Sequence, residues 1–121
     1  MNNDQSASQR MTGVAVAYKF EKADDEIVKV LVKTMHEDPN TNVRMAALEA
    51  LGKFHEEPTV RKELIHSLSI QKDPMVQIAL IQLLVNMKEK SVMKDLERMT
   101  KDRNTVKAVK DEAYSGILKL S

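Results

Sequence analysis

The sequence has no cysteine and no tryptophan, and it has only two phenylalanines, two tyrosines, three glycines and three prolines. Without cysteine, the protein has no disulfide framework, no thiol nucleophile and no cysteine-ligated zinc site. So few glycines and prolines argue against a β-sandwich or barrel, whose turns need such residues about every 8–12 positions. Because aromatic residues make up only 3% of the chain, the core must be aliphatic.

Neither an excess of one charge nor a long apolar run is present. Lysine and arginine number 19 and aspartate and glutamate 18, which gives a formal net charge of +1. This balance leaves no electrostatic signature of nucleic-acid binding. No run approaches the roughly 18 apolar residues of a membrane span, and the first ten residues lack a signal peptide's apolar region. Since 42% of the 121 residues are hydrophobic, we expect one folded domain that makes no membrane contact.

A repeat is present. Three twelve-residue segments beginning at Val43, Val76 and Val109 align without gaps, 33 residues apart. Each has an apolar residue at its first, fifth, ninth and twelfth positions. This spacing forms one stripe of an α-helix.

A further amphipathic helix is predicted before each segment, over residues 26–36, 59–70 and 91–101. Asp38-Pro39 and Asp73-Pro74 are interpreted as an N-cap followed by a proline at the first helical position. Thr59 and Ser91 are the predicted N-caps of two of the preceding helices. Ala46, Ala47 and Ala50 are predicted to face the partner helix, where small residues allow close approach.

Helix pairs that cannot bury their stripes alone must stack. The predicted fold is therefore all-α, a short α-α superhelix or solenoid of about three helix pairs plus a leading helix. Its single domain, 1–121, divides into a leading half-repeat 1–22 and repeats 23–55, 56–88 and 89–121. Ser6 or Ser8 caps the leading helix, which runs to about Phe20. A leading second helix without its first suggests that the chain is part of a longer protein.

The run from Asp38 to Gly52, Asp-Pro-Asn-x-x-Val-Arg-x-x-Ala-x-x-Ala-Leu-Gly, resembles a HEAT repeat. The resemblance implies a HEAT- or armadillo-like solenoid.

A narrower resemblance covers about residues 5–120. Its motifs are Gln5-Ser-Ala-Ser-x-Arg10, Asp24-Asp25-Glu26, residues 42–51, Val60-Arg61, residues 74–79 and Glu89-Lys90. They are similar to the C-terminal HEAT-like tail of membrane-anchored zinc-finger anti-sigma-type proteins of Bacteroidetes-like bacteria. The resemblance implies an upstream sigma-binding head and membrane helix, and an extracytoplasmic, periplasmic location, with a cytoplasmic one as the alternative. It carries over no catalytic residues, and nothing in this chain resembles the sigma-binding part.

Two His-Glu dipeptides, His36-Glu37 and His55-Glu56, require an enzyme to be considered, because helical-repeat hydroxylases hold two irons with such pairs. Here they stand at predicted helix ends and 19 residues apart, which breaks the repeat. A histidine at a helix C-terminus complements the helix dipole without a metal. The acidic run 24–26 is likewise interpreted as a helix N-terminus rather than a calcium site. No metal site, catalytic residue or cofactor is expected.

Arg44, Gln77 and Lys110 occupy the same position of successive repeats. This position lies at the seam with the next repeat, so a structural role is favoured over a basic ladder for an acidic partner. The predicted structural ladder joins Arg44 to Asp38 or Asp73.

The face turned away from the predicted core carries an unexpected apolar strip rimmed by polar residues, which is typical of a contact site. The alternative is that another part of the same chain covers it; substituting aspartate at both Ile78 and Val85 distinguishes the two. The candidate protein-binding residues are Met45, Glu49, Lys53, Ile78, Gln82, Val85, Asn86, Leu118 and Lys119.

The sequence favours a non-catalytic protein-interaction or scaffold domain, the regulatory tail of an anti-sigma-like protein. A helical-repeat enzyme or lyase subunit and a homo-oligomerisation domain remain the alternatives. The expected partner is a protein or peptide, including a second copy of the chain, and not a nucleic acid.

Overall fold

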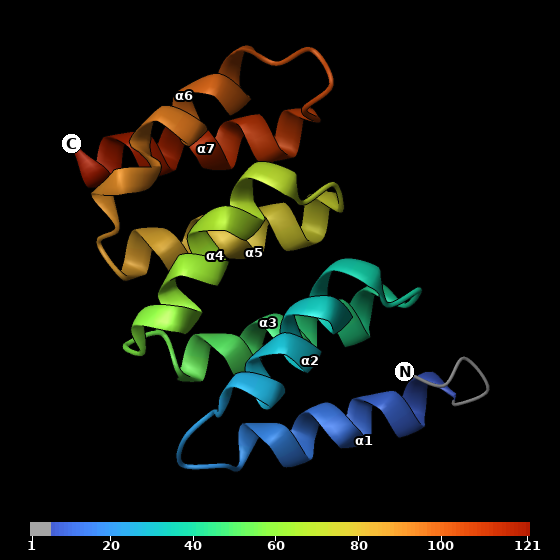
Figure 1. Cartoon of the computed structure of the whole chain (residues 1–121). Helices are drawn as coiled ribbons and strands as arrows, with labels where there is room; N and C mark the ends of the chain where they lie inside the picture. The colour runs from blue at the N-terminus through green and yellow to red at the C-terminus, as the bar shows by residue number, and fades with distance from the viewer. Residues whose placement is uncertain (1–5) are drawn as a thin grey trace. The chain divides into compact units, whose positions relative to one another are not determined.

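The computed structural model describes residues 6–121. Across that range it contains seven α-helices, one short 3-10 helix and no β-strand (Figure 1). The all-α prediction of helix pairs preceded by a leading helix is confirmed. Gln5, part of a sequence motif above, and the other first residues of the predicted half-repeat 1–22 lie outside the described residues.

The chain divides into two compact units, Met1–Arg61 and Lys62–Ser121. Unit 1 contains α1 (Ala7–Tyr18), α2 (Asp25–Glu37) and α3 (Thr41–Lys53). Unit 2 contains α5 (Pro74–Asn86), the 3-10 helix η1 (Lys90–Val92), α6 (Met93–Lys101) and α7 (Lys107–Leu120). The division falls within α4 (Pro58–Ile70). The boundaries predicted at residues 22, 55 and 88 remain a prediction.

Unit 1 is built around α3. Both α1 and α2 pack against it, and α2 and α3 are joined by only three residues, as in a helical hairpin (Figure 1). The apolar stripes meet in a mainly aliphatic core, where Leu31, Met35, Val43 and Ala47 are fully or almost fully buried. The helix pair therefore supplies a platform on which α1 is held.

Unit 2 repeats this plan. Here α5 and α6 both pack against α7, as α1 and α2 pack against α3. Leu80, Leu96, Val109 and Ala113 are completely buried. Residues of α1 and α3 correspond to those of α5 and α7 after a shift of two 33-residue repeats. In this alignment Val14 is equivalent to Leu80, and Ala47 is equivalent to Ala113.

Several helix starts follow the sequence. Ser6 and Gln9 form a capping box at α1, in which each side chain bonds to the other residue's backbone N–H. Asp24 accepts a hydrogen bond from Ile27 N at 2.9 Å, so the acidic run begins α2 as expected. Asp73 accepts from Met75 N at 2.9 Å, with Pro74 as the first residue of α5. Of the two residues predicted as possible caps of the leading helix, Ser6 is the cap, and the interpretation of Asp73-Pro74 is confirmed.

The other predicted caps are wrong. Asp38 ends α2, and the cap of α3 is Asn40, whose side chain accepts from the N–H groups of Asn42 and Val43. Thr59 lies inside α4, because that helix starts at Pro58. Ser91 lies in η1 and donates to the Glu89 carboxylate instead of capping α6. In each case a nearby residue or a 3-10 turn takes over the start of the helix.

None of the helices in the part of the chain that the structure describes is long and apolar enough to cross a membrane.

Candidate functional site

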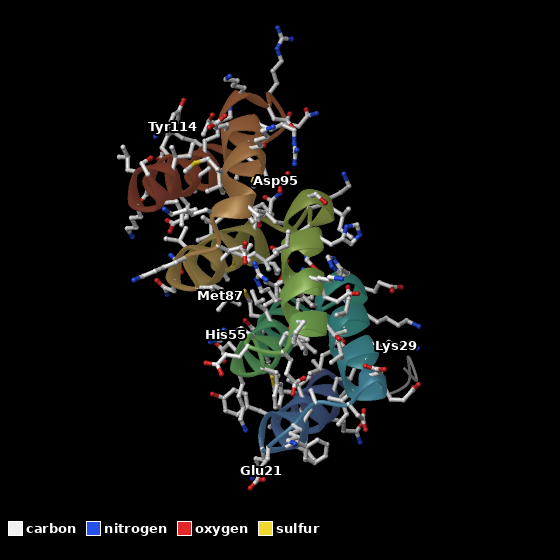
Figure 2. All side chains as sticks on the ribbon, turned by 60° about the vertical axis from the view of Figure 1, so that its left-hand side comes forward. Glu21, Lys29, His55, Met87, Asp95 and Tyr114 are labelled. Carbon is white, nitrogen blue, oxygen red and sulfur yellow. The ribbon has the colours of Figure 1, made fainter. Side chains whose placement is uncertain are left out.

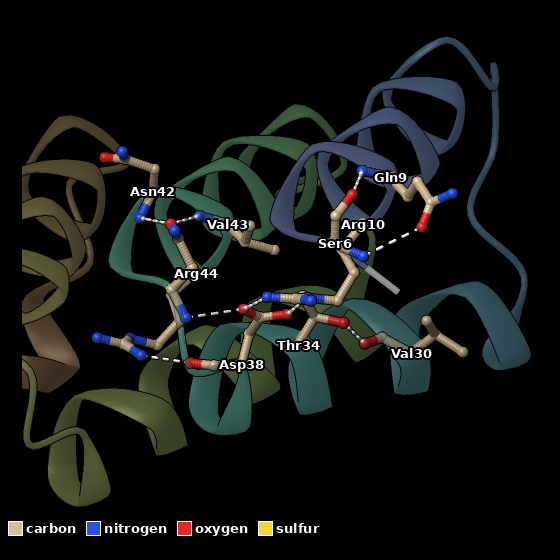
Figure 3. A network of polar contacts seen from close by, with 10 residues as sticks. Ser6, Gln9, Arg10, Val30, Thr34, Asp38, Asn42, Val43 and Arg44 are labelled. Atoms are coloured by element: carbon tan, nitrogen blue, oxygen red, sulfur yellow. Dashed lines mark hydrogen bonds and ion pairs between the residues drawn. The ribbon is translucent and has the colours of Figure 1, made fainter. Parts of the chain in front are cut away.

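The side chain of Arg44 turns back onto the residue that ends α2. Its Nη1 donates to the backbone carbonyl of Asp38 (Figure 3). Its Nη2 donates to Thr41 Oγ1 at 2.6 Å. Gln77, one repeat later, does the same: its Nε2 donates to the carbonyl of Gln71 at 2.8 Å. In both units the side chain at the seam position donates a hydrogen bond to the backbone carbonyl of the residue that follows the preceding helix. These side chains therefore have a structural role.

The carboxylate of Asp38 forms an ion pair with a residue of another helix. Arg10 of α1 donates through Nε to Oδ2 at 2.7 Å and through Nη2 to Oδ1 at 3.2 Å, and the two side chains are 9% and 0% exposed (Figure 3). Asp38 Oδ1 also accepts from Asn40 N at 2.9 Å. The sequence analysis missed this pair, although Arg10 stands where the other repeats have a valine.

In unit 1 the candidate protein-binding residues all lie on α3. Met45 is half-buried, while Glu49 and Lys53 are exposed. Lys53 Nζ donates to the backbone carbonyls of Tyr18 and Phe20, the latter at 2.9 Å. It also lies 5.1 Å from the centre of the Tyr18 ring, a cation–π distance. Lys53 therefore fastens the end of α1 to α3 and is not simply available to a partner.

In unit 2 the structure brings four candidate residues together. They line an open depression of about 220 Å³ between α5 and α7, which we call the α5–α7 depression. One wall is apolar and the rest carries amide, hydroxyl and charged groups, a mixture suited to a peptide segment. The lining residues are Gln82, Val85, Asn86, Glu112, Ser115, Gly116 and Lys119.

The apolar members of the strip in unit 2 differ in exposure. Leu118 is 77% exposed, but Ile78 and Val85 are half-buried. A Cβ built on Gly116 would lie 3.1 Å from Val85 Cγ2, so the missing side chain of Gly116 lets α7 approach α5 closely. Val85 therefore contributes to the packing of α5 on α7, and the expectation that it points away from the core is wrong. Aspartate at Val85 would disturb folding as well as any contact surface.

Tyr114 is an exposed residue that the sequence analysis did not select. It is 56% exposed (Figure 2), and Leu118 follows one helical turn later on α7. Its equivalents in the earlier repeats, Leu48 and Ile81, are buried. A signal was available in the sequence, because Tyr114 is an aromatic residue at a position where the two earlier repeats have aliphatic ones.

Neither His-Glu dipeptide lies in a metal-binding arrangement among residues 6–121, where no group of three or more potential ligands gathers. His36 lies in the last turn of α2, and His55 follows the end of α3. The Asp24 carboxylate is used as a helix cap.

The comparisons agree with the helix-pair geometry. The HEAT-repeat family model matches residues 27–57, which span most of α2 and all of α3. The chain therefore carries a HEAT repeat at its first helix pair, and HEAT repeats commonly mediate contacts between proteins. No curated protein and no solved structure matches the chain.

Proposed function

We propose that this chain is a non-catalytic protein-binding domain whose contact surface includes the α5–α7 depression. The observation that carries the proposal is the convergence of Gln82, Val85, Asn86 and Lys119 on one depression of unit 2. Leu118, a highly exposed apolar side chain, stands on the same helix. A partner seated in the depression would bond to its polar groups and bury the exposed Leu118 beside it, since protein interfaces combine apolar contacts with polar ones.

The proposed partner is a protein or peptide rather than a nucleic acid. The depression offers one apolar wall, two amides, one hydroxyl and charges of both signs. A nucleic-acid surface would need clustered arginine and lysine with aromatic stacking platforms. A second copy of this chain is a partner of the same kind.

The test compares two exposed apolar residues of unit 2. Leu118→Asp places a charge beside the depression, and the matched control Met75→Asp places one at a residue that is 57% exposed and outside the lining. Affinity capture with the purified chain from an extract of its source, membrane fraction included, should recover a protein that Leu118→Asp loses and Met75→Asp keeps. Circular dichroism should show both variants folded. Equal recovery by wild type and both variants would contradict the proposal.

Sedimentation at several concentrations separates the second-copy case from the others. A dimer that Leu118→Asp abolishes would identify the partner as this chain itself. A monomer at all concentrations assigns the surface to a different protein.

On the sequence resemblance alone, we further propose that the domain is the regulatory tail of a membrane-anchored anti-sigma-like protein, on the extracytoplasmic side. Immunoblotting of fractionated source cells tests this. We expect the antigen in the membrane fraction and cleavable by protease added outside the cytoplasmic membrane. An antigen found only in the cytoplasm would contradict it without affecting the proposed protein-binding role.

A further inference from the structure

A second cavity of unit 2 lies at the starts of α5 and α7, away from the later turns of these helices that line the α5–α7 depression. It has a volume of about 280 Å³ and lies between the turn that joins α4 to α5 and the loop that joins α6 to α7. We call it the turn cavity. All of its lining residues fall within positions 68–106, so two neighbouring helix pairs of unit 2 form it.

The apolar part of the lining has a buried and an exposed portion. Leu68 of α4 and Met99 of α6 are 2% and 6% exposed. Ile70, the last residue of α4, and Val106, directly before α7, are 48% and 46% exposed. The turn cavity therefore offers aliphatic surface that is open to a bound group.

Two cationic side chains line the turn cavity from different elements. Lys72 belongs to the α4–α5 turn, and its ammonium forms no ion pair within residues 6–121. Arg98 of α6 bonds through Nη2 to Asp95 Oδ1 at 2.9 Å, in a pair whose side chains are 57% and 23% exposed. Such an exposed pair contributes little to stability, and a guanidinium has five N–H donors. Arg98 therefore keeps donors for a further oxygen.

One carboxylate, that of Asp102, also lines the turn cavity. Its Oδ1 accepts a hydrogen bond from Asn104 N at 2.8 Å. The neighbours of Asp102 in the loop, Lys101 and Arg103, are both exposed cations. Two cations against one carboxylate leave the lining with a net positive charge, which the flanking residues increase.

The uncharged polar residues of the lining divide into two groups. Ser69 Oγ donates to a carbonyl of its own helix at 2.7 Å, and Gln77 Nε2 donates to the Gln71 carbonyl at 2.8 Å. The side-chain oxygen of Gln71 accepts from two backbone N–H groups. The side chains of Asn104 and Thr105 form no hydrogen bond among the described residues. An amide and a hydroxyl are thus available beside the cations.

We propose that the turn cavity binds an acidic peptide segment of a partner protein, with a glutamate or aspartate carboxylate between Lys72 and Arg98. Arginine and carboxylate form charge-assisted hydrogen bonds, which are stronger than neutral ones. An aliphatic neighbour in the same peptide would cover Ile70 or Val106. These exposed apolar residues favour a peptide over a free small anion, because a small anion would contact the cations alone.

The probe is the capped peptide acetyl-Leu-Glu-Glu-Leu-amide, titrated into the full 121-residue chain and followed by NMR. We expect saturable shift changes at the amides of Lys72, Asn104 and Thr105. Added sodium chloride should weaken binding, because exposed charge pairs are screened. The same peptide with both glutamates replaced by glutamine should bind at least fivefold more weakly. Equal binding of the two peptides, or no binding at millimolar peptide, would overturn the proposal.

Two small anions, glutarate and inorganic phosphate, test the choice of a peptide as the ligand. Both should bind more weakly than the acidic peptide, because neither covers the aliphatic residues of the lining. A small anion that binds as tightly as the peptide would contradict the proposal.

Paired charge removals locate the peptide. Lys72→Gln combined with Arg98→Gln should weaken binding at least fivefold. The matched control, Lys90→Gln combined with Lys94→Gln, removes the same charge at exposed residues outside the lining and should bind within twofold of wild type. Circular dichroism should show both double variants folded. Equal weakening in the two would attribute binding to net charge and contradict the site.

Asp102→Asn tests the sign of the charge effect. It removes the one carboxylate of the lining, while the amide oxygen of asparagine can still accept from Asn104 N. The acidic peptide should therefore bind at least twofold more tightly. Unchanged or weaker binding, with the melting temperature of wild type, would contradict the proposal.

The proposal does not depend on the α5–α7 depression, so Leu118→Asp should leave peptide binding unchanged. Shift changes at Gln82 and Asn86 in place of Lys72 and Asn104 would move the peptide to that depression and overturn the assignment to the turn cavity.

Discussion

At the scale of single residues, the buried ion pair between Arg10 and Asp38 distinguishes the first repeat from the others. Valine stands at the positions equivalent to Arg10, and Gln71 stands at the position equivalent to Asp38. Buried ion pairs are often no more stable than an apolar replacement, but a single buried charge is costly. The main effect of the pair is therefore to fix the orientation of α1 on the α2–α3 hairpin, rather than to add net stability.

Replacing Asp38 with alanine is expected to lower the free energy of unfolding by about 3–5 kcal/mol, because the guanidinium of Arg10 loses its buried carboxylate. Urea unfolding followed by circular dichroism measures this. The matched control is the double variant Arg10→Val with Asp38→Gln, which installs the residue types of the next repeat, Val43 and Gln71. It should recover most of the loss. A double variant as unstable as Asp38→Ala would show that the charges themselves are required.

Ala47 tests the packing of α3. Its side chain is completely buried, so Ala47→Leu should overpack the core and destabilise the protein by about 1–3 kcal/mol. Thermal unfolding measures the effect, with Ala15→Leu on exposed α1 surface as the control for leucine itself. A melting temperature equal to that of wild type would place Ala47 against solvent and shift the register of α3.

At the scale of the helices, the end of α5 contains the one positive-φ non-glycine residue in the range 6–121. Lys88 has φ 57°, and the N–H groups of Lys88 and Glu89 bond to the carbonyls of Val85 and Leu84 at 2.9 and 3.0 Å. This is a Schellman motif, in which glycine usually takes the left-handed position. A lysine there pays the steric cost of a Cβ.

Lys88→Gly is expected to raise the free energy of unfolding by about 0.5–1 kcal/mol. The left-handed conformation costs a residue with a Cβ roughly 1–2 kcal/mol, and the greater freedom of glycine in the unfolded chain offsets part of that gain. Chemical denaturation measures the change. Lys88→Ala removes the same charge but keeps the Cβ, so it should not stabilise. Equal stabilisation by both variants would attribute the effect to charge.

The helices themselves could be predicted from the sequence because their signal is periodic and strong. The ends of the helices were harder to predict from the sequence. Asp73-Pro74 caps α5 as predicted, but the similar Asp38-Pro39 does not cap α3, because Asn40 follows and its side chain takes the cap. Two capping residues within three positions compete, and the geometry of the turn decides between them.

At the scale of the whole molecule, repeat pairing was visible in the sequence, while the details of the surfaces were not. The helical spacing placed Leu118 on the face turned away from the core, and Leu118 is 77% exposed. The spacing could not show that Gly116 lets α7 approach Val85 closely. Arg10–Asp38 joins residues 28 positions apart, and nothing local marks such a pair.

The 121-residue chain is expected to hold no stoichiometric metal, since neither His-Glu dipeptide contributes to a ligand group within the described residues. Elemental analysis after tag removal should find less than one iron or zinc per chain. EDTA should leave the melting temperature unchanged. One or more bound metal ions per chain would contradict the non-catalytic account.

The most direct test of the central claim, that protein contacts pass through the α5–α7 depression, is site-specific photo-crosslinking in the source organism. A benzoylphenylalanine residue at position 118 should give a discrete adduct with one protein, in much higher yield than the same group at Met75. Adding Gln82→Arg and Asn86→Arg at the rim should abolish that adduct without unfolding the chain. Equal, diffuse crosslinking from both positions, or an adduct indifferent to the rim substitutions, would contradict the account.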